Sequence, residues 1–183
     1  MSETRAGQKL AGVLRGLRVD FDGKVVLDIG SSTGGFTGLA LAGGAEKVIA
    51  VEKGTGQMRA ELAVDPRVEL HEKTDIFGFA PTVVPDMILV DVSFVSLRKV
   101  LDYVRKHLAG ENTEFLVLLK PQFEVDDSAL YKGIVKSNRV RREVMVDFEQ
   151  WLKGNGFVVL GKRDSGVAGR FGNQERFYHL RLA

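Results

Sequence analysis

One short segment, residues 25 to 37, constrains the fold of this chain more than any other. The apolar run Val25-Val26-Leu27 reaches Asp28, passes through a glycine-rich turn, and continues into a helix-like apolar stretch from Phe36 to Leu41. Glycines permit a sharp turn and let a ligand approach the backbone without a Cβ in the way. The pattern predicts a buried strand, a ligand-binding loop and a helix.

A second apolar run, Val48 to Val51, ends in Glu52, an acid placed to hold two ribose hydroxyls. Together the two segments predict the front half of a nucleotide-type cofactor site. A Walker phosphate loop is excluded because no Gly-Lys-Ser/Thr follows the turn, and the spacing also differs from the G-x-G-x-x-G of dinucleotide dehydrogenases. The order Asp28-x-Gly30-x-x-x-Gly34-Gly35 is that expected of S-adenosylmethionine-dependent methyltransferases.

This pattern assigns roles within the expected cofactor site. Asp28 and Gly30 would lie near the amino-acid end of S-adenosylmethionine, Glu52 near its ribose and Asp75 near its adenine. For Asp75 an N-cap or turn role is equally consistent with the sequence. The full expected set of cofactor-binding residues is Asp28, Gly30, Ser31, Ser32, Thr33, Gly34, Gly35, Phe36, Glu52, Asp75 and Asp91.

Apolar strand-like runs alternate with helical patterns along the whole chain. We expect strands at 25–29, 47–51, 68–71, 87–91, 115–120, 157–162 and 176–180, and helices at 35–41, 56–63, 96–108 and 138–153. Near-continuous apolar strands between helices indicate a parallel sheet covered on both faces. We therefore predict one α/β domain over residues 1–183, with a Rossmann-like, seven-stranded, mostly parallel sheet, one reversed strand and a surface loop at 122–133.

The composition excludes several other classes of protein. No apolar run approaches the ~20 residues of a membrane-spanning helix, and the N-terminus carries no signal-peptide core. The chain contains no cysteine, and its three histidines show no metal-ligand spacing. We expect a cytoplasmic protein without bound metal or stable membrane association, present as a monomer or a weak dimer.

Positive charge is concentrated in one part of the chain, although the net charge is only +2. No acid interrupts the stretch from Tyr131 to Arg142, whereas acids gather between Glu61 and Asp86. A basic lobe beside a neutral-to-acidic lobe suits a polyanion on one side and a small ligand on the other, although basic runs are often only solvated helix faces. The expected RNA-binding residues are Arg5, Lys132, Lys136, Arg139, Arg141 and Arg142.

Two further charged residues end predicted central strands. Asp91 follows Met87 to Val90, at the sheet edge where ligands bind in such folds. Lys120 follows the apolar run Leu116 to Leu119, where its charge is costly to desolvate unless a carboxylate such as Asp91 pairs with it. Snorkelling of Lys120 to the sheet edge is the alternative.

The chain resembles the catalytic domain of the hemolysin A (TlyA) family, relatives of the FtsJ-like ribose methyltransferases. The resemblance covers nearly the whole chain, and several stretches carry it jointly. They are residues 4–10 (Thr-Arg-Ala-Gly-Gln-Lys-Leu), 27–37, 54–57 (Gly-Thr-Gly-Gln), 65–68, 91–97 (Asp-Val-Ser-Phe-Val-Ser-Leu), 120–124 (Lys-Pro-Gln-Phe-Glu), 132–135 and 172–175 (Gly-Asn-Gln-Glu). It implies S-adenosylmethionine-dependent 2′-O-methylation of ribose in ribosomal RNA or ribosomal subunits, typically at cytidine.

The FtsJ-like enzymes use a Lys-Asp-Lys-Glu tetrad, and the resemblance places it here at Lys9, Asp91, Lys120 and Glu175. A ribose hydroxyl must lose its proton as it attacks a methyl group, and a lysine near other cations can act as the base. The expected base is Lys120, positioned by Asp91, with Lys9 adding positive potential and Glu175 orienting the lysines or the ribose. Exposed-lysine and edge-strand roles remain the alternatives for Lys9 and Glu175.

Family members generally carry a small RNA-binding domain before the catalytic domain, and we expect it to be absent from this chain, since Lys9 already belongs to the catalytic part. Three other functions compete with RNA 2′-O-methylation. One is a non-catalytic RNA- or ribosome-binding protein that keeps the fold. A second is a base amino-methyltransferase, although the Pro-Pro pair of that motif is missing after Asp91. The third is a membrane-active hemolysin.

Overall fold

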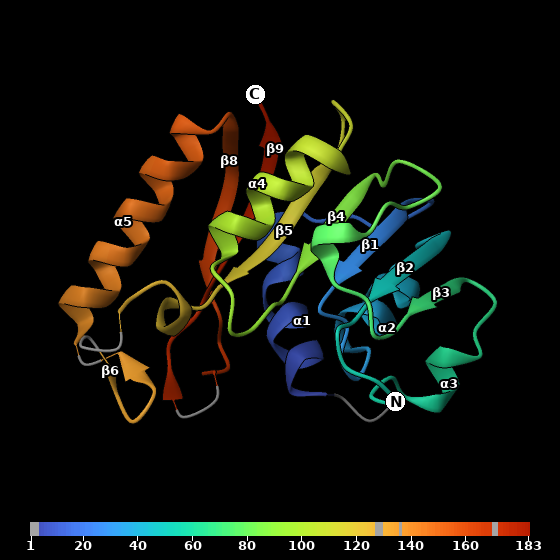
Figure 1. Ribbon diagram of the computed structural model, residues 1–183, viewed down its shortest axis with the longest axis horizontal. Coiled ribbons are helices and arrows are strands. Elements are labelled where there is room, and N and C mark those ends of the chain that lie inside the picture. The colour runs from blue at the N-terminus through green and yellow to red at the C-terminus, as the bar shows by residue number, and fades with distance from the viewer. Residues whose placement is uncertain (1–3, 127–129, 136, 170–171) are drawn as a thin grey trace.

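A seven-stranded sheet forms the centre of the protein, seen in Figure 1 as a computed structural model that describes residues 4–126, 130–135, 137–169 and 172–183. Its strands are β1 (Val25–Ile29), β2 (Lys47–Val51), β3 (Val68–His71), β4 (Met87–Val90), β5 (Glu114–Leu119), β8 (Phe157–Asp164) and β9 (Arg176–Leu182). The α-helices are α1 (Arg5–Leu17), α2 (Gly35–Ala42), α3 (Ala60–Ala63), α4 (Leu97–His107) and α5 (Asn138–Gly154). Two short strands, β6 (Leu130–Tyr131) and β7 (Ile134–Val135), pair separately as a hairpin.

The strand order is β3-β2-β1-β4-β5-β9-β8, and the first five strands in this order run parallel to one another. Strand β9 runs antiparallel to both β5 and β8, with Leu119 of β5 paired with Arg176 of β9. The predicted fold class, a seven-stranded and mostly parallel sheet with one reversed strand, is confirmed. The carboxyl ends of β1, β2, β4 and β5 meet at one edge of the sheet, where ligands bind in open α/β folds.

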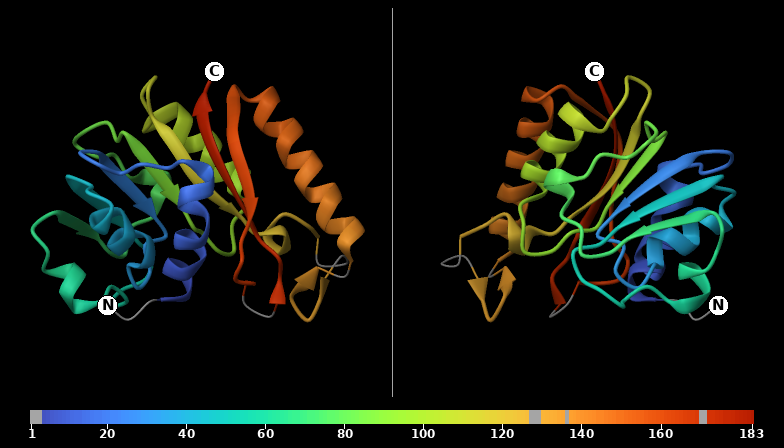
Figure 2. Two further views of the ribbon diagram at one scale, coloured as in Figure 1. Left: turned by 180° about the vertical axis from the view of Figure 1, so that it is seen from behind. Right: turned by 45° about the vertical axis from the view of Figure 1, so that its right-hand side comes forward.

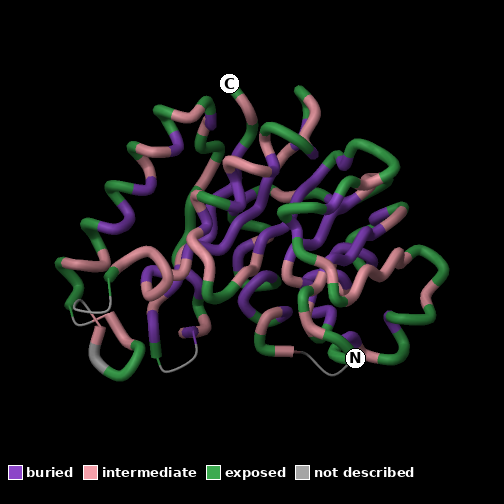
Figure 3. Tube along the Cα trace, in the orientation of Figure 1, coloured by how far each residue is buried: buried purple, intermediate pink, exposed green. Residues whose placement is uncertain are grey.

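The strands β1, β2, β4, β5 and β9 are mostly buried, and their side chains alternate between two apolar cores on the two faces of the sheet (Figure 3). In β5, Phe115, Val117 and Leu119 belong to one core, and Leu116 and Leu118 belong to the other. Figure 2 shows that α1 and α2 cover one face, whereas α4 and α5 cover the opposite face. This double covering explains why the strands read as continuous apolar runs in the sequence.

The first helix, α1, is the main element absent from the sequence prediction. Its start is set by Thr4, whose hydroxyl accepts a hydrogen bond from the amide of Gly7 at 3.0 Å. Its apolar residues, Leu10, Val13 and Leu17, recur at helical spacing and are buried against the sheet. The helix brings Lys9 to the carboxyl edge of the sheet, so it contributes to the site as well as to the core.

Two other predictions need correction. The helix expected at 56–63 is only the single turn α3 (Ala60–Ala63), because the chain bends at residues 53–56, where the φ of Gly56 is +65°. The surface loop expected at 122–133 contains part of a 3₁₀ turn at 121–123 and strand β6, although residues 127–129 lie outside the described part. Within the described residues, no helix is long and apolar enough to cross a membrane.

Candidate active site

The loop between β1 and α2 adopts the tight conformation that its glycines predict. Gly30 and Gly34 have φ values of +83° and +82°, in the left-handed region that favours glycine. A Cβ on Gly30 would collide with the backbone carbonyl of Asp91, so only glycine lets β1 and β4 approach closely here. The amide of Gly30 donates to the carbonyl of Val51 at 2.9 Å, which ties the loop to β2.

A cavity of about 700 Å³ opens beside this loop, at the carboxyl ends of β1, β2 and β4. Five residues of the expected cofactor set line it: Gly30, Ser32, Glu52, Asp75 and Asp91. A volume of this size lies within the range of ligand pockets. The acidic wall favours a ligand that carries positive charge and hydroxyl groups.

The carboxylate of Glu52 is held rigidly at the wall of this cavity. One of its oxygens accepts a hydrogen bond from the amide of Ser32 at 2.9 Å, and the other accepts from the amide of Gly54 at 2.6 Å. Each oxygen keeps a second lone pair that a ligand hydroxyl can use. The geometry therefore suits the ribose-binding role predicted for Glu52.

Asp75 has the N-cap role that its sequence position left open, and it also lies in the wall of the cavity. Its carboxylate accepts from the amide of Phe77 at 3.2 Å and caps the 3₁₀ turn Ile76–Gly78. It also pairs with Lys53 at 2.9 Å and lines the cavity. Lys53 and Phe77 line the same end of the cavity, and neither was among the expected residues.

The other members of the expected cofactor set belong to the loop or the start of α2 and do not line the cavity. Ser31 and Phe36 are buried, and Phe36 packs against Phe177 in the core. Gly35 lies where α2 meets α1, because a Cβ there would collide with Thr4 and Gly7. A Cβ on Gly34 would meet Met58 and Leu62, whereas Thr33 is exposed and its carbonyl accepts from Arg59.

Asp28 is fully buried beneath the loop, away from the cavity wall. Burial raises the pKa of its carboxyl to about 7, opposed by the hydrogen bond that Thr37 donates at 2.6 Å. The nearby carboxylates of Asp91 and Glu52 raise this pKa further. Asp28 thus acts as a buried link between β1 and α2, and it does not face the space that a ligand in the cavity would fill.

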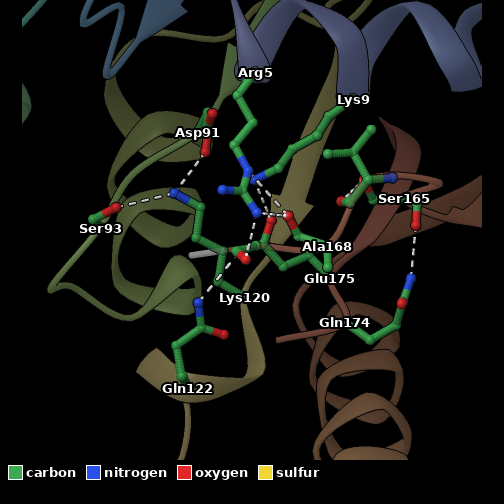
Figure 4. Close-up of polar contacts among 12 residues, drawn as sticks. Arg5, Lys9, Asp91, Ser93, Lys120, Gln122, Ser165, Ala168, Gln174 and Glu175 are labelled. Carbon is green, nitrogen blue, oxygen red and sulfur yellow. Dashed lines mark hydrogen bonds and ion pairs between the residues drawn. The ribbon is translucent and has the colours of Figure 1, made fainter. Parts of the chain in front are cut away.

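Four charged residues gather beside the cavity in two short ion pairs (Figure 4). The ammonium group of Lys9 lies 2.6 Å from a carboxylate oxygen of Glu175, and both side chains are almost completely buried. The ammonium group of Lys120 lies 2.7 Å from Asp91. The structure therefore brings together all four residues of the expected tetrad, from α1 and from the ends of β4, β5 and the β8–β9 loop.

Two neutral side chains complete this cluster, and the sequence analysis missed both. The Lys120 ammonium donates to the hydroxyl of Ser93 at 3.0 Å, and the amide nitrogen of Gln122 donates to Glu175 at 3.3 Å. Ser93 follows Asp91 by two residues and Gln122 follows Lys120 by two residues. This closeness in the sequence was the only local sign that the two side chains could join the cluster. They restrict the orientation of Lys120 and Glu175.

Phe94 is a third residue that the sequence analysis missed. It lines the mouth of the cavity, is 89% exposed, and has a φ of +63°, which is strained for an aromatic residue. Its ring lies 5.1 Å from that of Phe123, centre to centre. An exposed aromatic ring held in a strained conformation beside a cavity is typical of a ligand-contacting position.

Arg5, expected to bind RNA, contacts the protein itself. Its guanidinium donates to the carbonyls of Ala168 and Gly169, with the shortest contacts at 2.5 Å and 2.8 Å (Figure 4). Gly169 in turn packs against Glu175, because a Cβ there would collide with the Glu175 carboxylate. Arg5 therefore holds the β8–β9 loop beside the Lys9–Glu175 pair.

The remaining basic residues of the expected RNA-binding set occupy different environments. Arg141 pairs with Asp164 at 2.8 Å and donates to the carbonyl of Gln174, whereas the exposed Arg139 pairs with Glu143. Arg142 is exposed on α5, and Lys132 is exposed at the turn of the β6–β7 hairpin. Lys136 lies outside the described residues. Among the residues that the structure describes, no three acidic or histidine side chains form a group able to hold a metal ion.

Comparison with known proteins relates this arrangement to one family. A model of the family described as FtsJ-like methyltransferase matches residues 3–182. The 23S rRNA (cytidine-2′-O)-methyltransferase TlyA of Campylobacter jejuni is 35% identical over 178 residues, which cover 96% of this chain and 69% of that protein. The Bacillus subtilis protein YqxC is 36% identical over 182 residues, and the match spans 97% of this chain but only 64% of YqxC.

A solved structure from Streptococcus thermophilus has the same fold, with a TM-score of 0.92 and 33% sequence identity. The match covers 98% of this chain and 66% of the Streptococcus chain. This chain therefore spans about two thirds of the length of these similar proteins.

Proposed function

The chain belongs to the FtsJ-like methyltransferase family, and on this premise we propose that it transfers a methyl group from S-adenosylmethionine to the 2′-hydroxyl of a cytidine ribose in ribosomal RNA. The observation that carries the proposal is the cluster of Lys9, Asp91, Lys120 and Glu175, in two ion pairs, beside a cavity of cofactor size. Action on ribosomal RNA also suggests the cytoplasm as the place of the reaction.

The cavity has the chemistry needed to hold S-adenosylmethionine. Glu52 would bind the ribose hydroxyls, and Asp75 with Phe77 would contact the adenine end. Gly30 and Asp91 would lie toward the amino-acid end, where acidic groups favour the positive charges of the cofactor. When bound, S-adenosylmethionine supplies an electrophilic methyl group on a positively charged sulfur.

The tetrad would activate the ribose hydroxyl. In this proposal Lys120 first releases one proton to solvent, and its neutral amine then accepts the proton that the 2′-hydroxyl loses, while Asp91 and Ser93 fix the position of the amine nitrogen. Lys9 places positive charge near the oxygen that develops negative charge, and Glu175 holds Lys9 in place at 2.6 Å. Correct placement of the hydroxyl supplies much of the remaining rate enhancement.

Phe94 offers a surface for the base of the target nucleotide. Its ring is 89% exposed, lies next to Ser93 and is braced by Phe123. Aromatic side chains bind unpaired bases by stacking, which contributes about 1–3 kcal/mol for each base. Such stacking would hold the nucleotide with its ribose toward Lys120.

The decisive experiment incubates the protein with methyl-labelled S-adenosylmethionine and either ribosomal subunits or naked ribosomal RNA. We expect label in RNA, located at the 2′-oxygen of a cytidine when the modified nucleotide is mapped. Label on a base nitrogen or carbon would contradict the proposal. Firm binding of S-adenosylmethionine with no methyl transfer to either substrate would instead favour a non-catalytic RNA-binding protein.

A further inference from the structure

A second, smaller cavity lies next to the tetrad, lined by residues that neighbour Lys120 and Glu175 in the sequence. Its volume is about 250 Å³, close to the lower end of the range for ligand pockets, which begins at about 300 Å³. Its walls come from Pro121, the β6–β7 hairpin, the start of α5 and residues 172–174. Pro121 directly follows Lys120 and Gln174 directly precedes Glu175, so two residues of the cavity wall are sequence neighbours of tetrad members; Figure 4 shows Gln174 beside Glu175.

One side chain holds the walls of this second cavity together. Asn173 is 3% exposed, and its side-chain Nδ2 donates to the backbone carbonyl of Gly133 at 2.9 Å. Its side-chain Oδ1 accepts from the backbone amide of Val135 at 3.0 Å. The carbonyl of Asn173 also accepts from the amide of Gly169 at 2.6 Å. The cavity is therefore preorganised by hydrogen bonds between the hairpin and the loop that carries Glu175.

Part of the wall offers apolar surface to a planar ligand. Pro121, Ile134 and Val135 supply aliphatic surface suited to the face of a ring. Arg141 is paired with Asp164 at 2.8 Å, which compensates its positive charge.

Polar groups at the edge of the cavity add both donors and acceptors. The side chain of Asn138 makes no hydrogen bond to any described residue, which leaves its amide nitrogen and oxygen available. Gln174 uses its amide nitrogen to donate to the carbonyl of Ser165 at 2.7 Å, which leaves its side-chain oxygen as an acceptor. A nucleobase carries the matching pattern of donors and acceptors along its edge.

We propose that this second cavity binds a nucleobase of the RNA next to the methylated nucleotide. The inference rests on the proposed function, because it takes RNA as the substrate of the neighbouring tetrad. It assigns two bases to two places, with the target base against Phe94 and its neighbour between Pro121 and Gln174. Unpaired neighbouring bases are required to reach both places, so the substrate would be a single-stranded or opened segment.

Residue-resolved NMR of the full chain with cytidine tests this site without any methyl transfer. With S-adenosylhomocysteine present to fill the first cavity, we expect cytidine to shift the amide signals of Val135, Asn138 and Gln174. Ribose 5-phosphate and inorganic phosphate should leave these signals unchanged. An equal response to phosphate would overturn the proposal, as would no response at about 10 mM cytidine, where even a millimolar site is filled.

Matched substitutions separate the cavity from the rest of α5. Asn138→Ala and Gln174→Ala should each weaken cytidine binding by roughly three- to tenfold, because each removes hydrogen bonds to the base. Gln150→Ala removes the same amide group from an exposed position of α5 outside the cavity and should have no effect. Equal weakening by all three variants would contradict the site. The NMR titration measures cytidine binding and needs no methyl transfer. A failure of the methyl-transfer assay would therefore refute the proposed function without changing the outcome of the titration.

Discussion

Lys9 and Glu175 are 166 positions apart in the sequence, yet their charged atoms lie 2.6 Å apart in a buried ion pair. The pair joins α1 to the loop before β9, so it links two segments that the sheet alone does not connect. Burying two charges is costly unless each partner is present. The contact therefore bears on stability as well as on the proposed reaction.

We expect Glu175→Ala to lower the free energy of unfolding by about 3–5 kcal/mol, because it leaves the Lys9 ammonium buried without its partner. The double variant Lys9→Met, Glu175→Met should recover much of this loss while remaining inactive. Urea unfolding measures the stabilities. Unfolding midpoints equal to that of the unmodified protein would show that the pair contributes nothing to stability.

Lys120→Ala should lower kcat for RNA methylation by about 10²- to 10⁴-fold, since it removes the proposed proton acceptor. Binding of S-adenosylmethionine, measured by isothermal titration calorimetry, should change little because Lys120 is not part of the cofactor cavity wall. Lys106→Ala, which removes a lysine paired with Asp102 on α4, serves as the control with normal kcat. Full turnover by Lys120→Ala would refute the assigned role.

Phe94→Gly should raise the KM for RNA by roughly 5- to 150-fold, which corresponds to the loss of about 1–3 kcal/mol of base stacking. Its folding stability should stay the same or increase, because glycine adopts the φ of +63° without strain. Phe77→Ala changes a lining residue that comes from the turn after β3, and it should weaken cofactor binding and leave the KM for RNA unchanged. The KM for RNA is measured for both variants. A KM that rises for Phe77→Ala but not for Phe94→Gly would contradict the role of Phe94.

Folding stability should decrease as the pH rises from about 4 to about 7, because of Asp28. Its pKa is about 7 in the folded protein and near 3.8 when exposed, so the folded state holds a proton that the unfolded state has lost. Between these two pKa values, the free energy of unfolding falls by about 1.4 kcal/mol for each rise of one pH unit, because unfolding releases the proton. Asp28→Asn should flatten this part of a plot of urea midpoint against pH, leaving a smaller slope from Glu124, whose pKa burial also raises. An unchanged slope would contradict the assignment.

Arg5→Ala should lower kcat more than it raises the KM for RNA. The Arg5 guanidinium donates to the carbonyls of Ala168 and Gly169, and its loss would loosen the loop that holds Glu175. Arg142→Ala, at an exposed position of α5, is the comparison that should raise KM alone. If Arg5→Ala instead changed only the KM, the expectation of direct RNA contact would be correct.

The loop and strand ends that line the first cavity were predictable because their signals are local. Strand, glycine turn and helix follow one another in the sequence, and Glu52 ends the next strand at the same edge. Periodicity could not reveal that Asp28 lies beneath the loop, since burial of a carboxyl depends on packing against α2. For α1, the helical spacing of Leu10, Val13 and Leu17 is the local signal from which the helix could have been predicted.

The tetrad was predictable only through the family resemblance. No local pattern relates Lys9 to Glu175, because their contact depends on how α1 and β9 meet in the folded sheet. The sequence also could not reveal which basic side chains form contacts within the protein. Arg141 is bound to Asp164, and Arg5 is bound to backbone carbonyls, although both read as free positive charge in the sequence.

The single reversed strand has a geometric consequence for where acids can be placed. Parallel strands bring only the residues that follow them to the carboxyl edge of the sheet, as Asp91 follows β4 and Lys120 follows β5. Because β9 is antiparallel, the residue that precedes it, Glu175, reaches that same edge opposite Lys120. A parallel strand of the same seven residues would have carried Glu175 to the far edge, about 20 Å away. The direction of one strand thus decides whether Glu175 can lie at the same edge of the sheet as Lys120.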